Sequence, residues 1–162
     1  MTQITSALRR DPNKVPLQDK DGITVIKSMT FAGATANDPG DYTGGTGNPA
    51  TLFTVTGDVI LRVIAICKTS LTGSSATLEV GVSGDTAAII AQTTATTIDA
   101  NEVWHDATSD ATKELDSVSA AWIISNGQDV IQTAATANID TGVIAYYCQF
   151  RPLSEDGNVV AA

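Results

Sequence analysis

The feature that most constrains the fold is an apolar stretch at residues 59–67, where both sets of alternate positions are hydrophobic. The first set comprises Val59, Leu61, Val63, Ala65 and Cys67, and the second comprises Ile60, Arg62, Ile64 and Ile66. Successive side chains of a β-strand point to opposite faces, so a strand that is apolar at both sets is buried on both sides. Its β-branched residues favour a strand over a helix. The stretch therefore predicts the central strand of a β-domain, in which Arg62 needs a carboxylate partner or an exit at the sheet edge.

Turn-forming residues divide the rest of the chain into short segments with the composition of strands. Strands are predicted at residues 23–31, 51–56, 59–69, 76–83, 87–98, 118–125, 128–136 and 143–150. Segment 76–83 alternates cleanly between apolar and polar residues, so Glu79 should face solvent. About eight or nine short strands separated by frequent turns are typical of a β-sandwich. We therefore predict an all-β fold, a jelly-roll-like β-sandwich that carries an extended N-terminal arm.

Charge and composition divide the chain into an arm (1–21), a sandwich domain (22–152) and a short polar tail (153–162). The net charge is −9, from 9 basic and 18 acidic residues. Residues 1–27 hold five basic and three acidic residues, which leaves four basic and fifteen acidic residues in the remainder. Such an acidic body repels nucleic acid phosphates, so no nucleic acid partner is expected. The basic arm either docks on an acidic surface or is a solvated terminus.

Neither a membrane segment nor a secretory signal is expected from the sequence. No run approaches the roughly 20 apolar residues that a membrane span requires. The first residues also lack the apolar core of a signal peptide. We therefore expect synthesis in a host cytoplasm and no membrane partner.

The only histidine, His105, lies in a segment at 99–116 that is predicted to be irregular and acidic. Ser109 and Asp106 are near it in sequence, but a catalytic base needs a partner and an orienting group at fixed geometry. Calcium could be held by the oxygen ligands of Asp99, Glu102, Asp106 and Asp110. Their spacing fits no calcium-loop motif, and a solvated acidic edge is the alternative. We predict no catalytic residues, no cofactor and no metal site.

Two cysteines, Cys67 and Cys148, each lie inside an apolar segment that is predicted to be a strand. Cysteine packs as a small hydrophobic residue, which favours two buried free thiols. A disulfide would require neighbouring strands with Cα atoms within about 7 Å. Both states stay open at this point.

The chain has few aromatic residues, and for several of them the sequence predicts either a place in the core or a place at an interface. Trp122 is predicted to lie in the core, and only one of Tyr146 and Tyr147 should be buried, because they point to opposite faces of one strand. Trp104 either anchors an interface or plugs one end of the sandwich. In the long Gly- and Pro-rich loop at 32–50, Tyr42 is the aromatic residue that could anchor the loop on a neighbouring subunit. The candidates for a subunit interface are Tyr42, Trp104 and Tyr147.

Two stretches resemble known proteins. Residues 9–24, RRDPNKVPLQDKDGIT, resemble a short segment near the N-terminus of small virion proteins of tailed bacteriophages. The body, from FTVTGDVILRVIAIC through LEVGVSGDTAAIIAQTTATTIDANEVWHD to IISNGQDV, is similar to small β-rich proteins encoded among phage head genes. The resemblance implies a non-enzymatic structural protein on the capsid surface, either a decoration (cement) protein or the base of a head fibre.

What the resemblance implies about partners is also specific. Such proteins often form trimers and use an N-terminal arm to bind the major capsid protein. The arm residues expected to contact the shell are Arg9, Arg10, Lys14, Val15, Pro16 and Leu17. The segments 32–50 and 99–116 would meet sister subunits or the shell, and a contact would cover one face of the strands at 59–67 and 143–150. A neck or tail component of the virion, or a carbohydrate-binding host-adhesion module, is the alternative.

Overall fold

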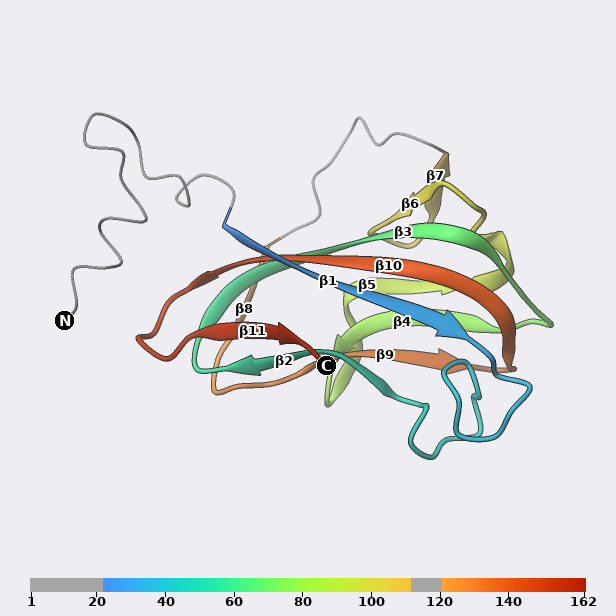
Figure 1. Ribbon diagram of the computed structural model, residues 1–162, viewed down its shortest axis with the longest axis horizontal. Helices are drawn as coiled ribbons and strands as arrows, with labels where there is room; N and C mark the ends of the chain where they lie inside the picture. Colours follow the sequence, from blue (N-terminus) through green and yellow to red (C-terminus); the bar gives the residue numbers. More distant parts are fainter. Residues whose placement is uncertain (1–21, 112–120) are drawn as a thin grey trace.

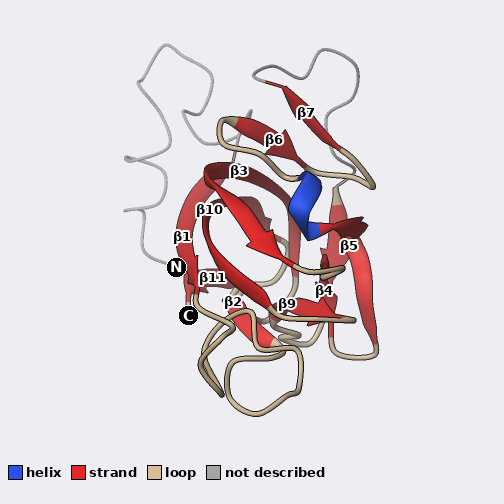
Figure 2. Ribbon diagram, turned by 90° about the vertical axis from the view of Figure 1, so that its right-hand side faces the viewer, coloured by secondary structure: helices blue, strands red, loops and turns tan. Residues whose placement is uncertain are grey.

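A computed structural model describes residues 22–111 and 121–162, which form two antiparallel β-sheets packed face to face (Figures 1 and 2). The prediction of an all-β sandwich is therefore confirmed. The jelly-roll arrangement stays a prediction. The predicted arm and its contact residues lie outside the described residues. Within the described part of the chain, the structure has no helical segment with the length and hydropathy of a membrane span.

The first sheet, here called sheet A, is built on the apolar stretch that opens the sequence analysis. Its strands follow the order β1-β10-β3-β6-β7, and β8 also pairs with β3. Their bounds are β1 Ile23–Phe31, β3 Val59–Gly73, β6 Glu102–Trp104, β7 Ser109–Ala111, β8 Trp122–Ile124 and β10 Ile139–Pro152. The apolar stretch lies in β3, between β10 on one side and the short strands β6 and β8 on the other. Its central position in the sheet is as predicted.

The second sheet, sheet B, covers one face of sheet A. Its order is β11-β2-β9-β4-β5. The bounds are β2 Ala50–Thr56, β4 Thr77–Val82, β5 Asp85–Thr94, β9 Val130–Ala135 and β11 Asn158–Ala161. A single 3-10 turn, η1, spans Ala95–Thr97. The turn ends the strand that was predicted to continue to residue 98.

Two regions that were predicted to lack strands contain them. The acidic segment carries β6 and β7, which pair with each other and join the edge of β3. The C-terminal tail carries β11, which pairs with β2 along its whole length and buries Val159. These strands have only three or four residues. A strand that short shows no periodicity, so only pairing with a distant partner reveals it.

The core is formed by the inner face of β3 and the strands opposite it. Val59, Val63, Ala65 and Cys67 are completely buried, whereas the alternate side chains at 60, 62, 64 and 66 are only half-buried. The prediction that this strand is buried on both faces was therefore wrong. Sheet B covers one side of β3, and no element of the described chain covers the other side as completely. The outer face of sheet A is thus left open.

Two buried hydrogen bonds link the sheets through the core. Tyr146 Oη on β10 donates to Gln132 Oε1 on β9 at 2.6 Å. Trp104 Nε1 on β6 donates to Thr93 Oγ1 on β5 at 2.9 Å. The rings of Trp104 and Tyr146 meet edge to face, with centroids 6.5 Å apart. Since all four side chains are buried, these bonds fix how the sheets align as well as satisfying polar atoms.

The Tyr146–Gln132 bond predicts an asymmetric response to mutation. The Tyr146→Phe variant should lose about 1–3 kcal/mol of unfolding free energy, because Gln132 Oε1 becomes a buried acceptor without a donor. Guanidinium unfolding measures the loss. The double variant Y146F/Q132M should recover most of it, because both polar partners are then replaced by apolar groups of similar shape. A single variant as stable as the wild type would show that the bond contributes nothing.

Candidate interaction surface

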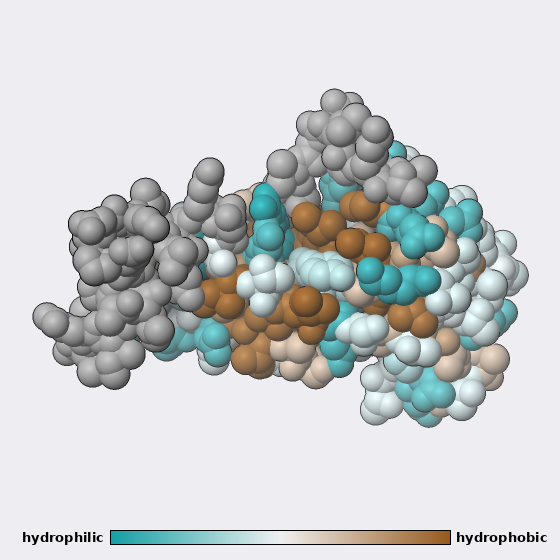
Figure 3. All heavy atoms as spheres, turned by 45° about the horizontal axis from the view of Figure 1, so that its top comes forward, coloured by the Kyte–Doolittle hydropathy of each residue, from teal (hydrophilic) through white to brown (hydrophobic). Residues whose placement is uncertain are grey.

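The outward side chains of sheet A form a surface on which large apolar residues lie among polar and charged ones, and we call this surface the open face. The ladder places Ile26, Tyr147 and Ile64 in one row across three strands, and Ile60 beside Ile123 in another. Ile123 is 69% exposed and Ile26 is 55% exposed. Apolar side chains gather near the centre of the side of the molecule that Figure 3 shows. The outward residues that define the open face are Thr24, Ile26, Ser28, Thr30, Ile60, Arg62, Ile64, Ile66, Lys68, Val103, Asp110, Ile123, Ala145, Tyr147, Gln149 and Arg151.

The open face is also where the body is basic. The described residues contain 13 acidic side chains and only four basic ones. Three of the four basic side chains, Arg62, Lys68 and Arg151, belong to the open face. The fourth, Lys27, donates to the backbone oxygen of Ala162. Lys68 Nζ lies 6.0 Å from the centroid of the Tyr147 ring, where the ring can stabilise the cation. Within residues 22–111 and 121–162, the open face therefore holds three of the four basic side chains and only one of the 13 acidic ones, Asp110.

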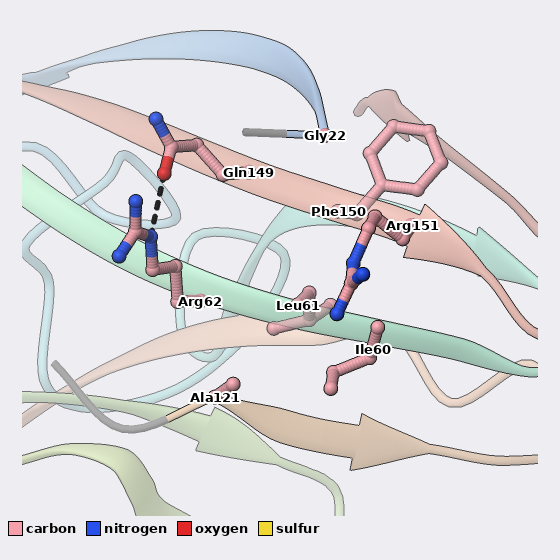
Figure 4. A pocket seen from close by; sticks show the side chains of 8 residues that line it. All are labelled: Gly22, Ile60, Leu61, Arg62, Ala121, Gln149, Phe150 and Arg151. Atoms are coloured by element: carbon pink, nitrogen blue, oxygen red, sulfur yellow. Dashed lines mark hydrogen bonds between the residues drawn. The ribbon is translucent and has the colours of Figure 1, made fainter. Parts of the chain in front are cut away.

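A hollow of about 210 Å³ in the open face is flanked by two of these basic residues (Figure 4). Arg62 lies opposite Gln149 and Arg151 lies opposite Ile60, so the two arginines are diagonal neighbours on adjacent strands. Arg62 Nε donates to Gln149 Oε1 at 2.5 Å. The expected carboxylate partner of Arg62 is thus replaced by a neutral amide. The hollow is lined by Gly22, Ile60, Leu61, Arg62, Ala121, Gln149, Phe150 and Arg151, none of them acidic.

A second hollow, of about 360 Å³, lies beside β8. Trp122 lines it and is 39% exposed, so the prediction that this tryptophan belongs to the core was wrong. The strand β8 pairs only with β3 in the described chain, which leaves its other side uncovered. The lining residues are Val82, Ala88, Ile89, Trp122, Ile123, Ile124, Ser125, Asn126 and Gln128.

The three predicted interface residues have different positions. Trp104 is completely buried within the chain, so its side chain fills part of the core and has no exposed area for an interface. Tyr147 is half-buried on the open face, whereas its neighbour Tyr146 is fully buried, as the alternation predicted. Tyr42 is 45% exposed in the long loop. The predicted arm contacts lie outside the described residues.

The long loop after β1 is held by side chains that replace regular pairing. The Asp41 carboxylate accepts bonds from Thr43 Oγ1 at 2.6 Å, from Thr43 N at 3.0 Å and from Asn37 N at 2.9 Å. These bonds favour the charged form and lower the pKa of Asp41. Asn48 fastens the loop to β9, since its amide accepts from Ala134 N and donates to Ala134 O. The loop therefore has a defined shape next to sheet B.

Carboxylates of the acidic segment, which were weighed as possible calcium ligands, bond instead to groups of the chain. The Glu102 carboxylate accepts from Asp99 N and from Ser109 Oγ, and Asp106 accepts from Thr108 N. These carboxylates hold the turns around β6 and β7. In residues 22–111 and 121–162, no group of three potential ligands is arranged to hold a metal ion. His105 is buried directly after β6.

Both cysteines are buried free thiols, which is the first of the two predicted states. They lie on the neighbouring strands β3 and β10, but Cys67 faces Ile144 and Cys148 faces Val63. Burial raises the pKa of Cys67 to about 11 and that of Cys148 to about 12. Their role is therefore to fill the core.

Comparison of the chain with protein-family models, with curated proteins and with solved structures finds no match.

The thiol pKa values predict a loss of stability at alkaline pH. Unfolded thiols lose their protons from about pH 8.5 upward, whereas the folded thiols keep theirs. The unfolded state then binds fewer protons, so the unfolding free energy falls as pH rises towards the folded pKa values near 11 and 12. The C67A/C148A variant should lose less stability than the wild type between about pH 8 and pH 10.

Urea unfolding at several pH values measures this difference. Each protein is compared with its own stability near neutral pH, because the alanine substitutions also remove packing contacts. Parallel pH profiles for the two proteins would contradict the assignment of the alkaline loss to the thiols.

Proposed function

We propose that this chain is a non-enzymatic structural protein of a bacteriophage particle, which decorates the capsid and stabilises it by bridging neighbouring subunits. The observation that carries the proposal is the open face of sheet A. Ile26 and Ile123 are large side chains exposed to more than half of their area. With the half-buried isoleucines of β3 they put several large apolar side chains on one face, interrupted by Arg62 and Gln149, and exposed apolar patches in folded proteins mark sites of protein contact.

The electrostatics of the body support the same kind of function. An apolar surface that also carries Arg62, Lys68 and Arg151 suits contact with acidic protein surfaces, because complementary charge steers and orients association. Exposed isoleucine makes the contact favourable, and the arginines make it specific. The resemblance of residues 9–24 to a phage virion segment supplies the biological setting.

Several modest contacts explain how such a protein could stabilise a shell. The arm offers one contact with the major capsid protein, and the open face offers another with a neighbouring subunit. Once one contact is made, the effective concentration for the second rises, so linked weak contacts bind far more tightly than either alone. Bridging then holds adjacent shell subunits together without a deep pocket.

Deleting residues 2–17 tests the role of the arm. The deletion removes Arg9, Arg10 and Lys14 together with Val15, Pro16 and Leu17. All strands of the sandwich lie beyond it, so the body should fold with an unchanged unfolding midpoint. We expect loss of co-sedimentation with phage particles assembled without this protein.

A matched variant tests whether particle binding depends on the charges of the arm or only on its length. The R9S/R10S/K14S variant keeps the arm at full length and removes only these three charges, so it should bind more weakly than the wild type and its binding should depend less on salt concentration. Full particle binding by the truncated chain would contradict the proposed role of the arm.

A carbohydrate-binding module remains a second candidate because of the hollow beside β8. Exposed Trp122 lies there with Ser125, Asn126 and Gln128, which gives a ring face and several hydrogen-bonding groups around one cavity. Glycan-array binding by the isolated protein that disappears in the W122A variant would favour this function over capsid decoration.

A further inference from the structure

We infer that the open face of sheet A binds a second copy of this chain head to tail, with a carboxylate of that copy seated between Arg62 and Arg151. The inference deepens the proposed function and rests on it only for the biological role of the contact. The contact itself follows from three properties of the described residues: an apolar surface, two guanidinium groups around one hollow, and the opposite charge of the remaining body.

The hollow is suited to a carboxylate because its arginines have unused donors. Only the Nε of Arg62 donates to Gln149, so both terminal nitrogens of Arg62 are still available as donors. Within residues 22–111 and 121–162, the side chain of Arg151 makes no hydrogen bond or ion pair. Figure 4 shows the two side chains at opposite ends of the set that lines the hollow. A guanidinium presents its N–H groups as a planar fork that matches the two oxygens of a carboxylate.

The setting strengthens such a bond. Diagonal neighbours on antiparallel strands have backbones about 7–8 Å apart, so two side chains as long as arginine can both reach an anion that lies between them. Ile60, Leu61 and Phe150 give the hollow apolar walls, and covering it with a partner would remove water from around the charges. Attraction between opposite charges rises as the local dielectric constant falls. Burial of the surrounding isoleucines offsets the free energy that removing water from the charges costs.

Charge complementarity identifies the occupant as this same chain. Outside the open face, the described residues contain 12 acidic side chains and one basic side chain, Lys27, while one further acidic residue, Asp110, lies at the edge of the face on β7. A second copy therefore presents far more carboxylates than basic groups on the rest of its described surface, even though Asp41 and Glu79 are buried. A symmetric face-to-face pair would instead bring Arg62, Lys68 and Arg151 of both copies together. Head-to-tail association avoids this repulsion, and such contacts close into a ring where the rotation between copies permits it.

Sedimentation velocity of the full chain, without particles, tests the inference. The wild type should form oligomers at micromolar concentration, and added salt should weaken them. The R151E variant should associate about tenfold more weakly or not at all, because it places a carboxylate where the partner's carboxylate must bind. The side chain of Arg151 is exposed and makes no bond to the described residues, so this variant should fold normally.

Two further variants make the result specific to the face. The K27E variant changes the net charge by the same amount as R151E but lies outside the open face, so its association should match that of the wild type. The I123S variant removes the most exposed isoleucine of the face and keeps all charges, so it should also dissociate. Thermal unfolding confirms that each variant is folded.

Mixing the proteins distinguishes the two geometries. In a head-to-tail contact, labelled R151E can still offer its acidic surface to the intact face of a wild-type copy, so mixed complexes should form. A wild type that stays monomeric overturns the inference, and so does equal weakening by K27E and R151E. A monomer that still binds particles would overturn this inference alone and leave the proposed function standing.

Discussion

Burial of the inner face of β3 against sheet B is the interaction on which the rest of the structure depends. Val59, Leu61, Val63, Ala65 and Cys67 are excluded from solvent along one side of a single strand. Fully burying a side chain such as leucine or valine contributes about 1.5–3 kcal/mol relative to exposure, so this row is a large share of the folding free energy. The neighbouring strand β10 adds Tyr146 and its bond to Gln132, which ties the sheets in one alignment.

The same strand explains why one surface is left for function. A two-layer sandwich covers only one face of each sheet, yet β3 is apolar at both sets of alternate positions. Its second set, with Ile60, Ile64 and Ile66, can be fully buried only by another molecule or by a further segment. The three basic side chains on that face differ in sign from the rest of the body, which gives any contact a preferred partner and orientation. Stability and proposed function thus depend on opposite faces of one strand.

Sequence reasoning was most reliable where the signal was local. The long strands, the central place of the apolar stretch and the burial of Tyr146 rather than both tyrosines all follow from alternation. It failed where the outcome depended on distant partners. Trp104 fills the core because three-residue β6 joins the edge of β3, whereas Trp122 is exposed because β8 has no second neighbour in the described chain. Glu79, expected in solvent, is buried, and Thr86 and Gln92 of β5 donate to its carboxylate, which offsets the cost of burying it.

The sequence by itself determined the all-β class, the main strands and the existence of a strand that is apolar on two faces. It did so because strand formation and side-chain alternation depend on neighbouring residues. Only the tertiary structure decided which of the two faces is covered, and it placed Arg62 beside Gln149 and diagonal to Arg151. That choice arises from strand pairing between residues more than eighty positions apart, and no local pattern encodes such a register.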